Sequence, residues 1–135
     1  MKIPARIRYA VRIMVEIARE PDQALALSEV EKRQMISAKF AKQILQPLMR
    51  AGLVQGVRGL KGGYRLLREP AGISLLEITR ALSRNEDRIA PCLLADDPCP
   101  RRGRCGVEVK WQELQQTIDD FLERTSLKDV IDGDD

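Results

Sequence analysis

The amino-acid sequence predicts a mainly α-helical protein in which three short helices precede a glycine-rich β-hairpin and a long helix lies near the end. Three observations predict this arrangement. Apolar residues recur with helical spacing in three stretches before residue 52, two β-prone runs flank a loop with three glycines, and an unbroken apolar seam follows residue 106. The chain has 135 residues, of which 44% are hydrophobic and 4% aromatic. This length allows one compact domain with an aliphatic core and one appended element.

The first two helices are predicted from apolar spacing and capping residues. Over residues 4–20 the apolar residues follow the i, i+3, i+4, i+7 spacing of an amphipathic helix, and Pro21 is a stop signal. Ser28 and Glu31 have the spacing of a capping box, in which each side chain bonds to the other residue's backbone. This pattern predicts a second short helix that runs from Ser28 to about Met35.

The third helix is predicted to follow the cap residue Ser37 and to reach about Ala51. Gly52 is the residue type that most often ends a helix, because glycine adopts the left-handed conformation freely. Pro47 lies inside this helix. Because proline has no backbone N–H and crowds the preceding turn, we expect it to bend the helix or to disturb its last turns.

A β-hairpin is predicted next, from Leu53–Val57 and Tyr64–Leu67, with a turn rich in glycine between them. Three short helices followed by such a hairpin form the winged helix-turn-helix pattern, in which the third helix enters the DNA major groove and the hairpin, or wing, reaches a neighbouring minor groove. The residues predicted to contact DNA are the exposed start of the third helix and the tip of the wing, namely Ser37, Ala38, Lys39, Lys42, Arg58, Gly59 and Lys61.

The distribution of charge supports a polyanionic partner for the first half of the chain. Residues 1–70 hold 14 Lys and Arg against 6 Asp and Glu, whereas residues 71–135 hold 9 against 14. The net charge of +3 therefore conceals a basic half and an acidic half, and a basic half favours nucleic acid as partner. No stretch is long and apolar enough to span a membrane, and the basic N-terminus does not resemble a signal peptide, so we expect a cytoplasmic protein.

The only cysteines, Cys92, Cys99 and Cys105, lie in one loop rich in Pro, Arg and Asp. Buried structural cysteines usually have apolar surroundings, and these do not. Three thiolates nearly complete a metal or cluster site, and the nearby arginines would offset its negative charge. Their spacing does not by itself distinguish iron–sulfur from zinc. The chain has no histidine, which removes histidine-based acid–base catalysis, and we expect no enzymatic activity.

The last third of the chain is predicted to be helical on both sides of the cysteine loop. Ser74 and Glu77 form a capping box that opens a helix to about Ser83, and a longer helix is predicted from about Val107 to Thr125. An apolar seam of alternating three- and four-residue steps favours a dimer interface over a core within one chain. The residues predicted at this interface are Trp111, Leu114, Ile118 and Phe121. The chain thus divides into a DNA-binding domain at 1–83, a cysteine loop at 84–106, and a dimerisation helix with an acidic tail at 107–135.

These motifs, in this order, resemble the IscR-type winged-helix regulators, an iron–sulfur family that includes NsrR and RirA. The residues that carry the resemblance are the run from Arg8 to Val11, the run from Ala51 to Val54, the wing run from Val57 to Leu66, and the three cysteines before a helix that contains Trp111. The resemblance implies a homodimeric regulator that binds a palindromic double-stranded DNA operator. It also implies that Cys92, Cys99 and Cys105 hold a [2Fe–2S] or [4Fe–4S] cluster whose loss, oxidation or nitrosylation changes DNA affinity.

The chain departs from this family at several positions, one of which is Arg8, where nitric-oxide-sensing relatives have a carboxylate that serves as fourth ligand for the partner chain. Glu108 stands where the assembly-operon repressor has a histidine three residues after its last cysteine, so Glu108 is the favoured fourth ligand. Lys42 stands where that repressor has an acidic base-reading residue, so a different operator is expected. Two other interpretations stay open: a metal-free regulator that senses redox state through its cysteines, and a zinc-stabilised protein-interaction module.

Overall fold

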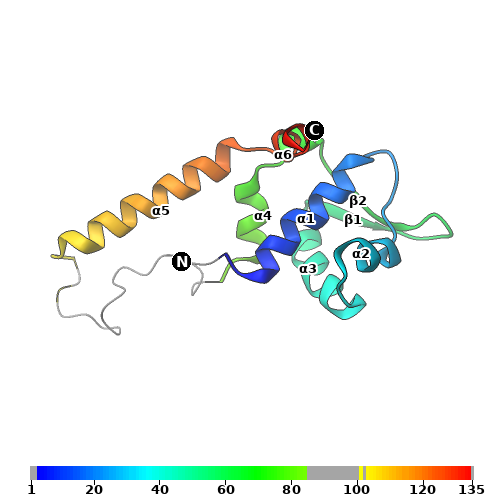
Figure 1. The fold of residues 1–135 in the computed structure, drawn as a ribbon, viewed down its shortest axis with the longest axis horizontal. Helices are drawn as coiled ribbons and strands as arrows, with labels where there is room; N and C mark the ends of the chain where they lie inside the picture. The colour runs from blue at the N-terminus through cyan, green and yellow to red at the C-terminus, as the bar shows by residue number, and fades with distance from the viewer. Residues whose placement is uncertain (1–2, 85–100, 102, 135) are drawn as a thin grey trace.

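The computed structural model of the protein describes residues 3–84, 101 and 103–134 (Figure 1). The elements in chain order are α1 (Ala5–Arg19), α2 (Leu27–Gln34), α3 (Ala38–Arg50), β1 (Val54–Val57), β2 (Gly63–Leu66), the 3-10 helix η1 (Pro70–Gly72), α4 (Leu75–Leu82), α5 (Gly106–Arg124) and α6 (Leu127–Gly133). The predicted class, mainly α-helical with one short β-hairpin, is confirmed. Among the described residues, no helix combines the length and the apolar character needed to cross a membrane.

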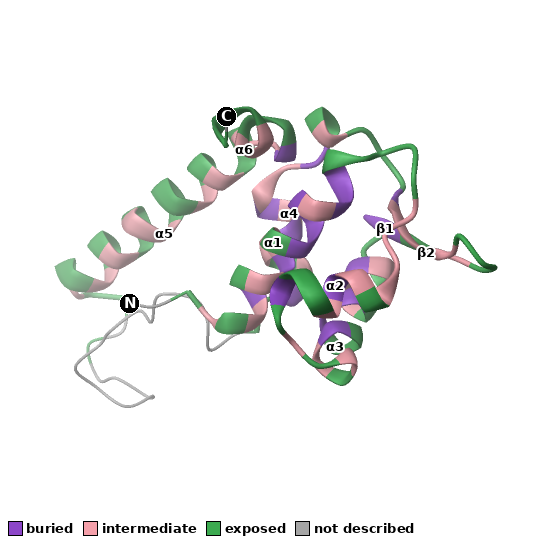
Figure 2. Ribbon diagram, turned by 45° about the vertical axis from the view of Figure 1, so that its right-hand side comes forward, coloured by how far each residue is buried: buried purple, intermediate pink, exposed green. Residues whose placement is uncertain are grey.

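Helix α1 lies at the centre of the helical part and packs against α3, α4 and α6. Its buried residues are Ile7, Ala10, Ile13, Met14, Val15, Ile17 and Ala18. Buried residues also mark the inner sides of α3 and α4 and the start of β1, whereas α5 has none along its length (Figure 2). The core therefore belongs to α1–α4, the hairpin and α6, and α5 extends away from it (Figure 1).

Helix α2 begins one residue earlier than predicted, and the capping box expected at Ser28 and Glu31 is absent. The helix starts at Leu27 with Ala26 as its cap, and no side chain caps it. The reason is a tertiary contact, because Leu25 pairs with Tyr64 through two backbone hydrogen bonds of 2.8 and 2.9 Å. This pairing holds the chain extended up to Ala26, so the first helical turn forms before Ser28 can act as its cap.

Helix α3 begins and ends as predicted. The Ser37 hydroxyl accepts a hydrogen bond from the Phe40 N–H at 3.1 Å, which is the expected N-cap contact. At the other end Gly52 adopts a φ of 75°, and the N–H groups of Gly52 and Leu53 donate to carbonyls of the last helical turn. Pro47 does not disrupt the helical hydrogen bonding after it, because its own carbonyl accepts from the Ala51 N–H at 3.0 Å.

The hairpin pairs β1 with β2 in antiparallel register, from Val54 opposite Leu66 to Val57 opposite Gly63. Its base is held against the segment before α2 by the bridge between Leu25 and Tyr64. At Gly63 a Cβ atom would lie 2.2 Å from the Leu25 carbonyl oxygen, so only glycine allows this close backbone approach. The wing is therefore fixed to the helix-turn-helix, and its tip projects beyond the body of the molecule (Figure 1).

The capping box at the start of α4 forms as predicted. The Ser74 hydroxyl accepts a hydrogen bond from the Glu77 N–H, and the Glu77 carboxylate accepts one from the Ser74 N–H. The segment between α5 and α6 pairs in antiparallel fashion with the segment that leads into α4. The Leu75 N–H donates to the Thr125 carbonyl at 2.9 Å, and the Leu127 N–H donates to the Ile73 carbonyl at 3.0 Å. Leu127 is fully buried and α6 packs on α1. The end of the chain thus contributes to the same core as α1–α4.

Candidate nucleic-acid interface and cysteine site

One face of α3 is buried and the other is open. Ala41, Ile44, Leu45 and Leu48 are buried against the core. Besides Arg50 at the end of α3, four exposed positions are spaced i, i+3, i+4 and i+7, which places them on one side of the helix. These residues are Lys39, Lys42, Gln43 and Gln46. Ser37 is exposed and Ala38 half-buried at the start of the same helix, so all four residues predicted from this element are at least partly accessible.

Gln43 and Gln46 were not among the residues predicted to contact DNA. The signal that identifies them is their spacing from Lys39 and Lys42, since residues three and four apart share a helix face. Glutamine can donate to and accept from adenine in the major groove, whereas lysine donates to guanine. The face thus presents two ammonium groups and two amides, a set of donors and acceptors suited to reading base edges.

The first turn of α3 is anchored to α1 by aromatic packing. The rings of Tyr9 and Phe40 meet edge to face, with centroids 5.5 Å apart and planes at 87°. The Arg12 guanidinium lies 5.1 Å from the Tyr9 ring centroid, in cation–π geometry. These contacts fix the angle at which α3 leaves the core, and Arg12 is itself exposed beside it.

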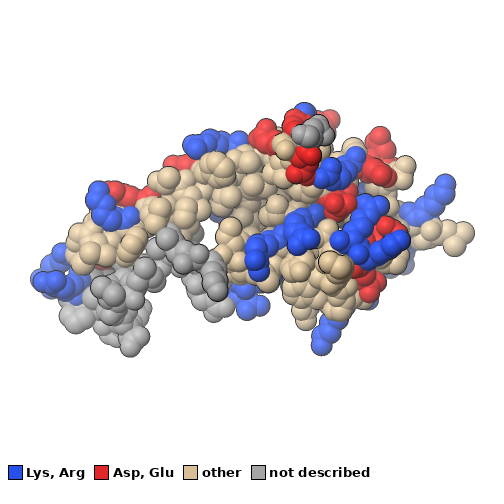
Figure 3. Space-filling model, in the orientation of Figure 1, with Lys and Arg blue, Asp and Glu red and all other residues tan. Residues whose placement is uncertain are grey.

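The tip of the wing carries exposed cations on a tightly folded turn. Arg58, Gly59 and Lys61 are exposed, and Gly59 adopts a φ of 111°. The Gly62 N–H donates to the Gly59 carbonyl at 3.0 Å and closes the turn. On the face of the molecule in Figure 3, Lys and Arg side chains gather over α1 and α2, and Asp and Glu gather around α6.

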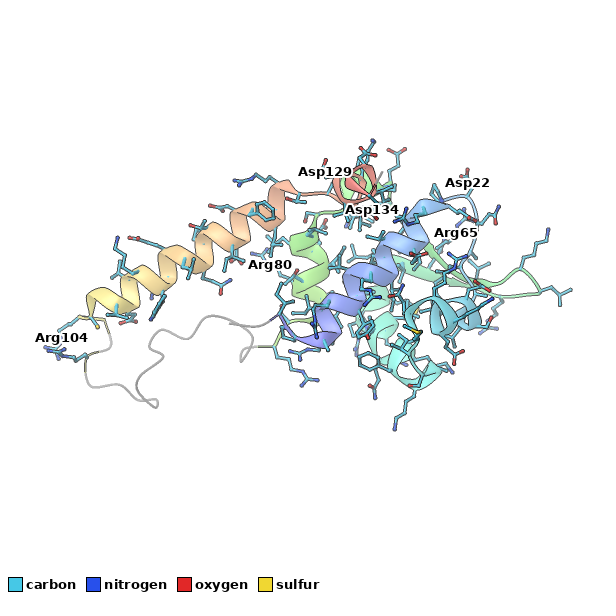
Figure 4. The ribbon with its side chains drawn as sticks, viewed as in Figure 1. Asp22, Arg65, Arg80, Arg104, Asp129 and Asp134 are labelled. Carbon is cyan, nitrogen blue, oxygen red and sulfur yellow. The ribbon has the colours of Figure 1, made fainter. Side chains whose placement is uncertain are left out.

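The described part of the cysteine site is the start of α5. Cys105 is the N-cap residue of α5, and its thiol is half-buried. Arg101, Arg104, Cys105 and Gly106 line an open hollow of about 450 Å³. Arg104 lies at the end of α5 that is remote from α1–α4 (Figure 4). The first turn of α5 and the side chains of Arg101 and Arg104 thus border the same hollow as Cys105.

Glu108 lies one turn into α5 and is half-buried, and its carboxylate accepts the Gly103 N–H at 2.6 Å. This bond uses Oε2 and folds the segment before α5 back onto its first turn. Trp111 lies three residues further on, and its buried indole N–H has no hydrogen-bond acceptor among the described residues. Cys92 and Cys99 lie outside the described residues, and within the described ranges no three Cys, His, Asp or Glu side chains gather into a metal site.

The chain matches the Rrf2 family, described as iron-dependent transcriptional regulators, over residues 3–133. It belongs to the Rrf2 family. It is 33% identical to the HTH-type transcriptional regulator IscR of Vibrio campbellii over 132 residues, a match that covers 97% of this chain and 77% of the relative. It is 30% identical to a putative HTH-type transcriptional regulator of Aquifex aeolicus, covering 93% of this chain and 88% of that one.

Two solved structures place this Rrf2 protein among winged-helix regulators. The structure of T. potens IscR superposes with a TM-score of 0.81 at 26% identity, and the match covers 100% of this chain and 89% of that one. CymR of B. subtilis, titled the global cysteine regulator, superposes with a TM-score of 0.78 at 30% identity and covers 100% and 99%. The winged-helix class and the resemblance to IscR-type regulators are therefore confirmed, and this Rrf2 protein is a DNA-binding transcription regulator.

The apolar seam predicted along α5 is uncovered in the single chain. Ile118 and Phe121 are exposed, the latter with 52% of its surface accessible, and Trp111 and Leu114 are half-buried. Val107 and Val109 are also exposed near the start of the helix. Among the described residues, the side of α5 that carries Val107, Ile118 and Phe121 is therefore only partly covered.

Proposed function

We propose that this Rrf2 protein is a homodimeric transcription regulator whose DNA affinity is controlled by a [2Fe–2S] or [4Fe–4S] cluster. Cys92, Cys99 and Cys105 would hold the cluster, with Glu108 as the fourth ligand, in the reducing setting of the cytoplasm. The observation that carries the proposal is that the half-buried residues Cys105 and Glu108 lie three residues apart at the start of α5, in a chain whose family is described as iron-dependent.

The donors near Cys105 fit an anionic sulfur-ligated group. Arg101 and Arg104 supply positive charge, and only Oε2 of Glu108 is used by the Gly103 N–H, which leaves Oε1 for a metal. The buried Trp111 N–H shares the Glu108 face of α5, and thiolate or sulfide sulfur would accept its hydrogen bond. When bound, such a cluster supplies a group that oxidation, nitric oxide or iron loss alters reversibly.

The ends of the cysteine segment are attached to different parts of the molecule. At one end the Arg6 side chain donates through Nε to the Leu82 carbonyl at 3.0 Å, which ties the end of α4 to α1. At the other end Cys105 begins α5, which we propose as the dimerisation helix through Trp111, Leu114, Ile118 and Phe121. A change in the conformation of the segment would therefore change the placement of α5 relative to the DNA-binding domain.

The DNA contacts of the proposal come from α3 and the wing. Lys39 and Lys42, with Ser37 and Ala38 just before them, would face the major groove. Arg58, Gly59 and Lys61 would approach the minor groove or phosphates. A twofold dimer presents two copies of α3, so a palindromic operator with half-sites about one helical turn apart is expected.

The decisive experiment is the metal content and DNA affinity of anaerobically purified protein. We expect brown protein with iron and acid-labile sulfide, and a DNA affinity that changes when the cluster is removed. Cys105→Ala should lose iron and sulfide while it keeps the helical circular-dichroism spectrum of the parent. Stoichiometric zinc, or no metal at all in the parent, would overturn the cluster proposal.

The fourth ligand has its own matched test. Glu108→Gln keeps an oxygen that can accept the Gly103 N–H but is a poor ligand, whereas Glu108→Ala loses both functions. We expect both variants to release the cluster faster than the parent, with Glu113→Gln, an exposed residue on α5, as the control. A Glu108→Gln variant with the parent's spectrum and release rate would assign Glu108 to holding the segment and not to ligation.

A second candidate function is a metal-free thiol switch, and one specific observation favours it. The chain covers 99% of the structure of CymR, the global cysteine regulator of B. subtilis, and it is also similar to the oxidized form of Staphylococcus aureus CymR. Under this alternative, peroxide would change the DNA affinity of metal-free protein and a reductant would reverse it. The Cys105→Ala variant would then bind DNA equally well before and after peroxide.

A further inference from the structure

Leu60 is the most exposed large hydrophobic residue of the described chain, with a relative accessibility of 109% at the tip of the wing. A side chain in this position buries no apolar surface and contributes nothing to the core. A single exposed leucine is common and by itself indicates nothing. Three features of its surroundings make this one informative.

The first feature is that the turn that carries Leu60 has one backbone conformation, which depends on its glycines. A Cβ atom at Gly62 would lie 2.4 Å from the Val57 carbonyl oxygen and 2.8 Å from that of Gly59, so the turn closes only with glycine there. Gly59 has a φ of 111°, which disfavours other residues. The turn thus holds Leu60 at a fixed, outward position.

The second feature is that the turn cannot swing freely on the body of the protein. Tyr64 exchanges two backbone hydrogen bonds with Leu25, and Gly63 lies against the Leu25 carbonyl. The hairpin is therefore attached at its base to the segment that leads into α2, and its tip projects outward (Figure 1). A fixed, projecting tip costs little further conformational entropy when it enters a binding site.

The third feature is charge. Leu60 lies between the exposed cations Arg58 and Lys61, and Asp and Glu are absent from the run of residues 54–68. Two cations on either side of an apolar side chain are complementary to a groove with anionic walls and a less polar floor. The DNA minor groove has this chemistry, because phosphates line its edges and sugars and base edges form its floor, about 6 Å across.

We infer that Leu60 enters the DNA minor groove and makes an apolar contact with sugars and base edges, while Arg58 and Lys61 bind the phosphates on either side. The inference rests on the proposed DNA-binding function and adds a sequence preference at the wing. The guanine N2 amino group occupies the floor of the minor groove, so an apolar side chain there prefers A·T pairs. Leu60 would therefore favour A·T pairs outside the segment read by α3.

The test uses a duplex that the parent protein selects from a random pool, with three versions of the flank that the wing protects from hydroxyl radicals. These flanks contain A·T, G·C or inosine·C pairs. Inosine lacks only the minor-groove amino group of guanine, so it separates minor-groove from major-groove reading. We expect Leu60→Ala to lose about tenfold affinity on the A·T and inosine·C flanks and much less on G·C.

Three controls make the result specific. Leu60→Met keeps an apolar side chain and should keep most of the affinity, while Leu67→Ala removes an exposed leucine just beyond β2 and should change nothing. Leu60→Ala should leave the dependence of affinity on salt unchanged and should abolish hydroxyl-radical protection at the flank. Protection of guanine N7 by α3 from dimethyl sulfate should persist.

The outcomes distinguish this inference from the proposed function. If the parent selects no duplex, DNA binding itself fails. If the parent binds and Leu60→Ala retains the same affinity, flank preference and hydroxyl-radical footprint, the role of Leu60 is excluded and DNA binding stands. A uniform loss on all three flanks would show that Leu60 contacts the duplex without reading its minor-groove floor, and would overturn the A·T preference.

Discussion

Leu25 and Tyr64 exchange both of their backbone hydrogen bonds, at 2.8 and 2.9 Å, although they lie in different segments of the chain. This one-residue bridge adds a third extended segment to the two-stranded hairpin. It also joins the two parts that the proposed DNA contact requires, the helix-turn-helix and the wing.

Gly63→Ala should destabilise the protein by about 2–4 kcal/mol, because a Cβ atom at this position would lie 2.2 Å from the Leu25 carbonyl oxygen and 2.7 Å from the Ala26 nitrogen. Gly56→Ala on β1 is the matched control, since nothing lies within 4 Å of its added Cβ. Urea denaturation of both variants checks the prediction. Equal stability of the two variants would show that the backbone at Leu25 can move away without cost.

Met35→Gly should stabilise the protein by about 0.5–1 kcal/mol. Met35 ends α2 with a φ of 52°, the only positive value among the described non-glycine residues, and its side chain is 87% exposed. Glycine would relieve the left-handed strain and lose almost no packing. Met35→Ala is the control, because alanine removes the same side chain but keeps the strain; thermal unfolding should rank glycine above methionine and alanine.

Glu77→Gln should destabilise the protein more at pH 7 than at pH 3. Burial raises the pKa of the Glu77 carboxyl, but hydrogen bonds from Arg68 and Ser74 outweigh it, and the net pKa lies below the ordinary value near 4.5. A carboxylate whose pKa is lower in the folded than in the unfolded protein stabilises the fold fully at pH values above its unfolded pKa. This stabilisation is lost as the pH falls through its folded pKa. Denaturation curves between pH 7 and pH 3 test this, with the exposed Glu123→Gln as a control that should show no such trend.

Ile118→Asp should prevent dimerisation. Ile118 lies in the uncovered apolar seam of α5, and a carboxylate buried without a partner at an interface costs several kcal/mol. Sedimentation velocity should show folded monomers, because α5 has no buried residue in the single chain and its loss from an interface leaves the core intact. Gln112→Asp, an exposed position of the same helix, should remain dimeric. A dimeric Ile118→Asp protein would place the interface elsewhere.

Lys42→Ala should cost about 1–3 kcal/mol at the selected site and flatten the preference at one base pair of each half-site, because an ammonium group reads guanine O6 and N7. Lys61→Ala should weaken all duplexes alike and lower the salt dependence by about one unit, as expected for a phosphate contact. Binding titrations on selected and scrambled duplexes at several salt concentrations separate the two effects. An equal loss on both duplexes for Lys42→Ala would make Lys42 a phosphate contact.

Local signals in the sequence were reliable where the structure depends on neighbours in the chain. The cap at Ser37, the capping box at Ser74 and the glycine end at Gly52 all form as predicted, because each depends on atoms within a few residues. The start of α2 was mispredicted, because a backbone pairing with Tyr64 fixes the segment before it. Backbone bridges between distant residues have no pattern in the sequence, since any residue type can form them.

The candidate site divides in the same way. Lys39 and Lys42 are predicted from their positions early in the third helix, whereas Gln43 and Gln46 are recognised only from their exposure in the folded protein. The hydrogen bond from Gly103 to Glu108 was also unforeseen, because it depends on how the segment before α5 folds back. The chemistry of a site can thus be inferred from residue types. Which of its atoms already take part in other hydrogen bonds, such as Oε2 of Glu108, depends on how the chain folds.

Near its C-terminal end, α5 is attached through the antiparallel contact between residues 73–75 and 125–127, and among the described elements it packs on α4. From there the 19 residues of α5 reach toward Cys105 as a lever. At about 1.5 Å per residue the lever is about 28 Å long, so a tilt of about 10° at its fulcrum moves the cysteine end by about 5 Å. A force at the Cys105 end that is too small to disturb the core would therefore rotate the whole of α5 about Ser126.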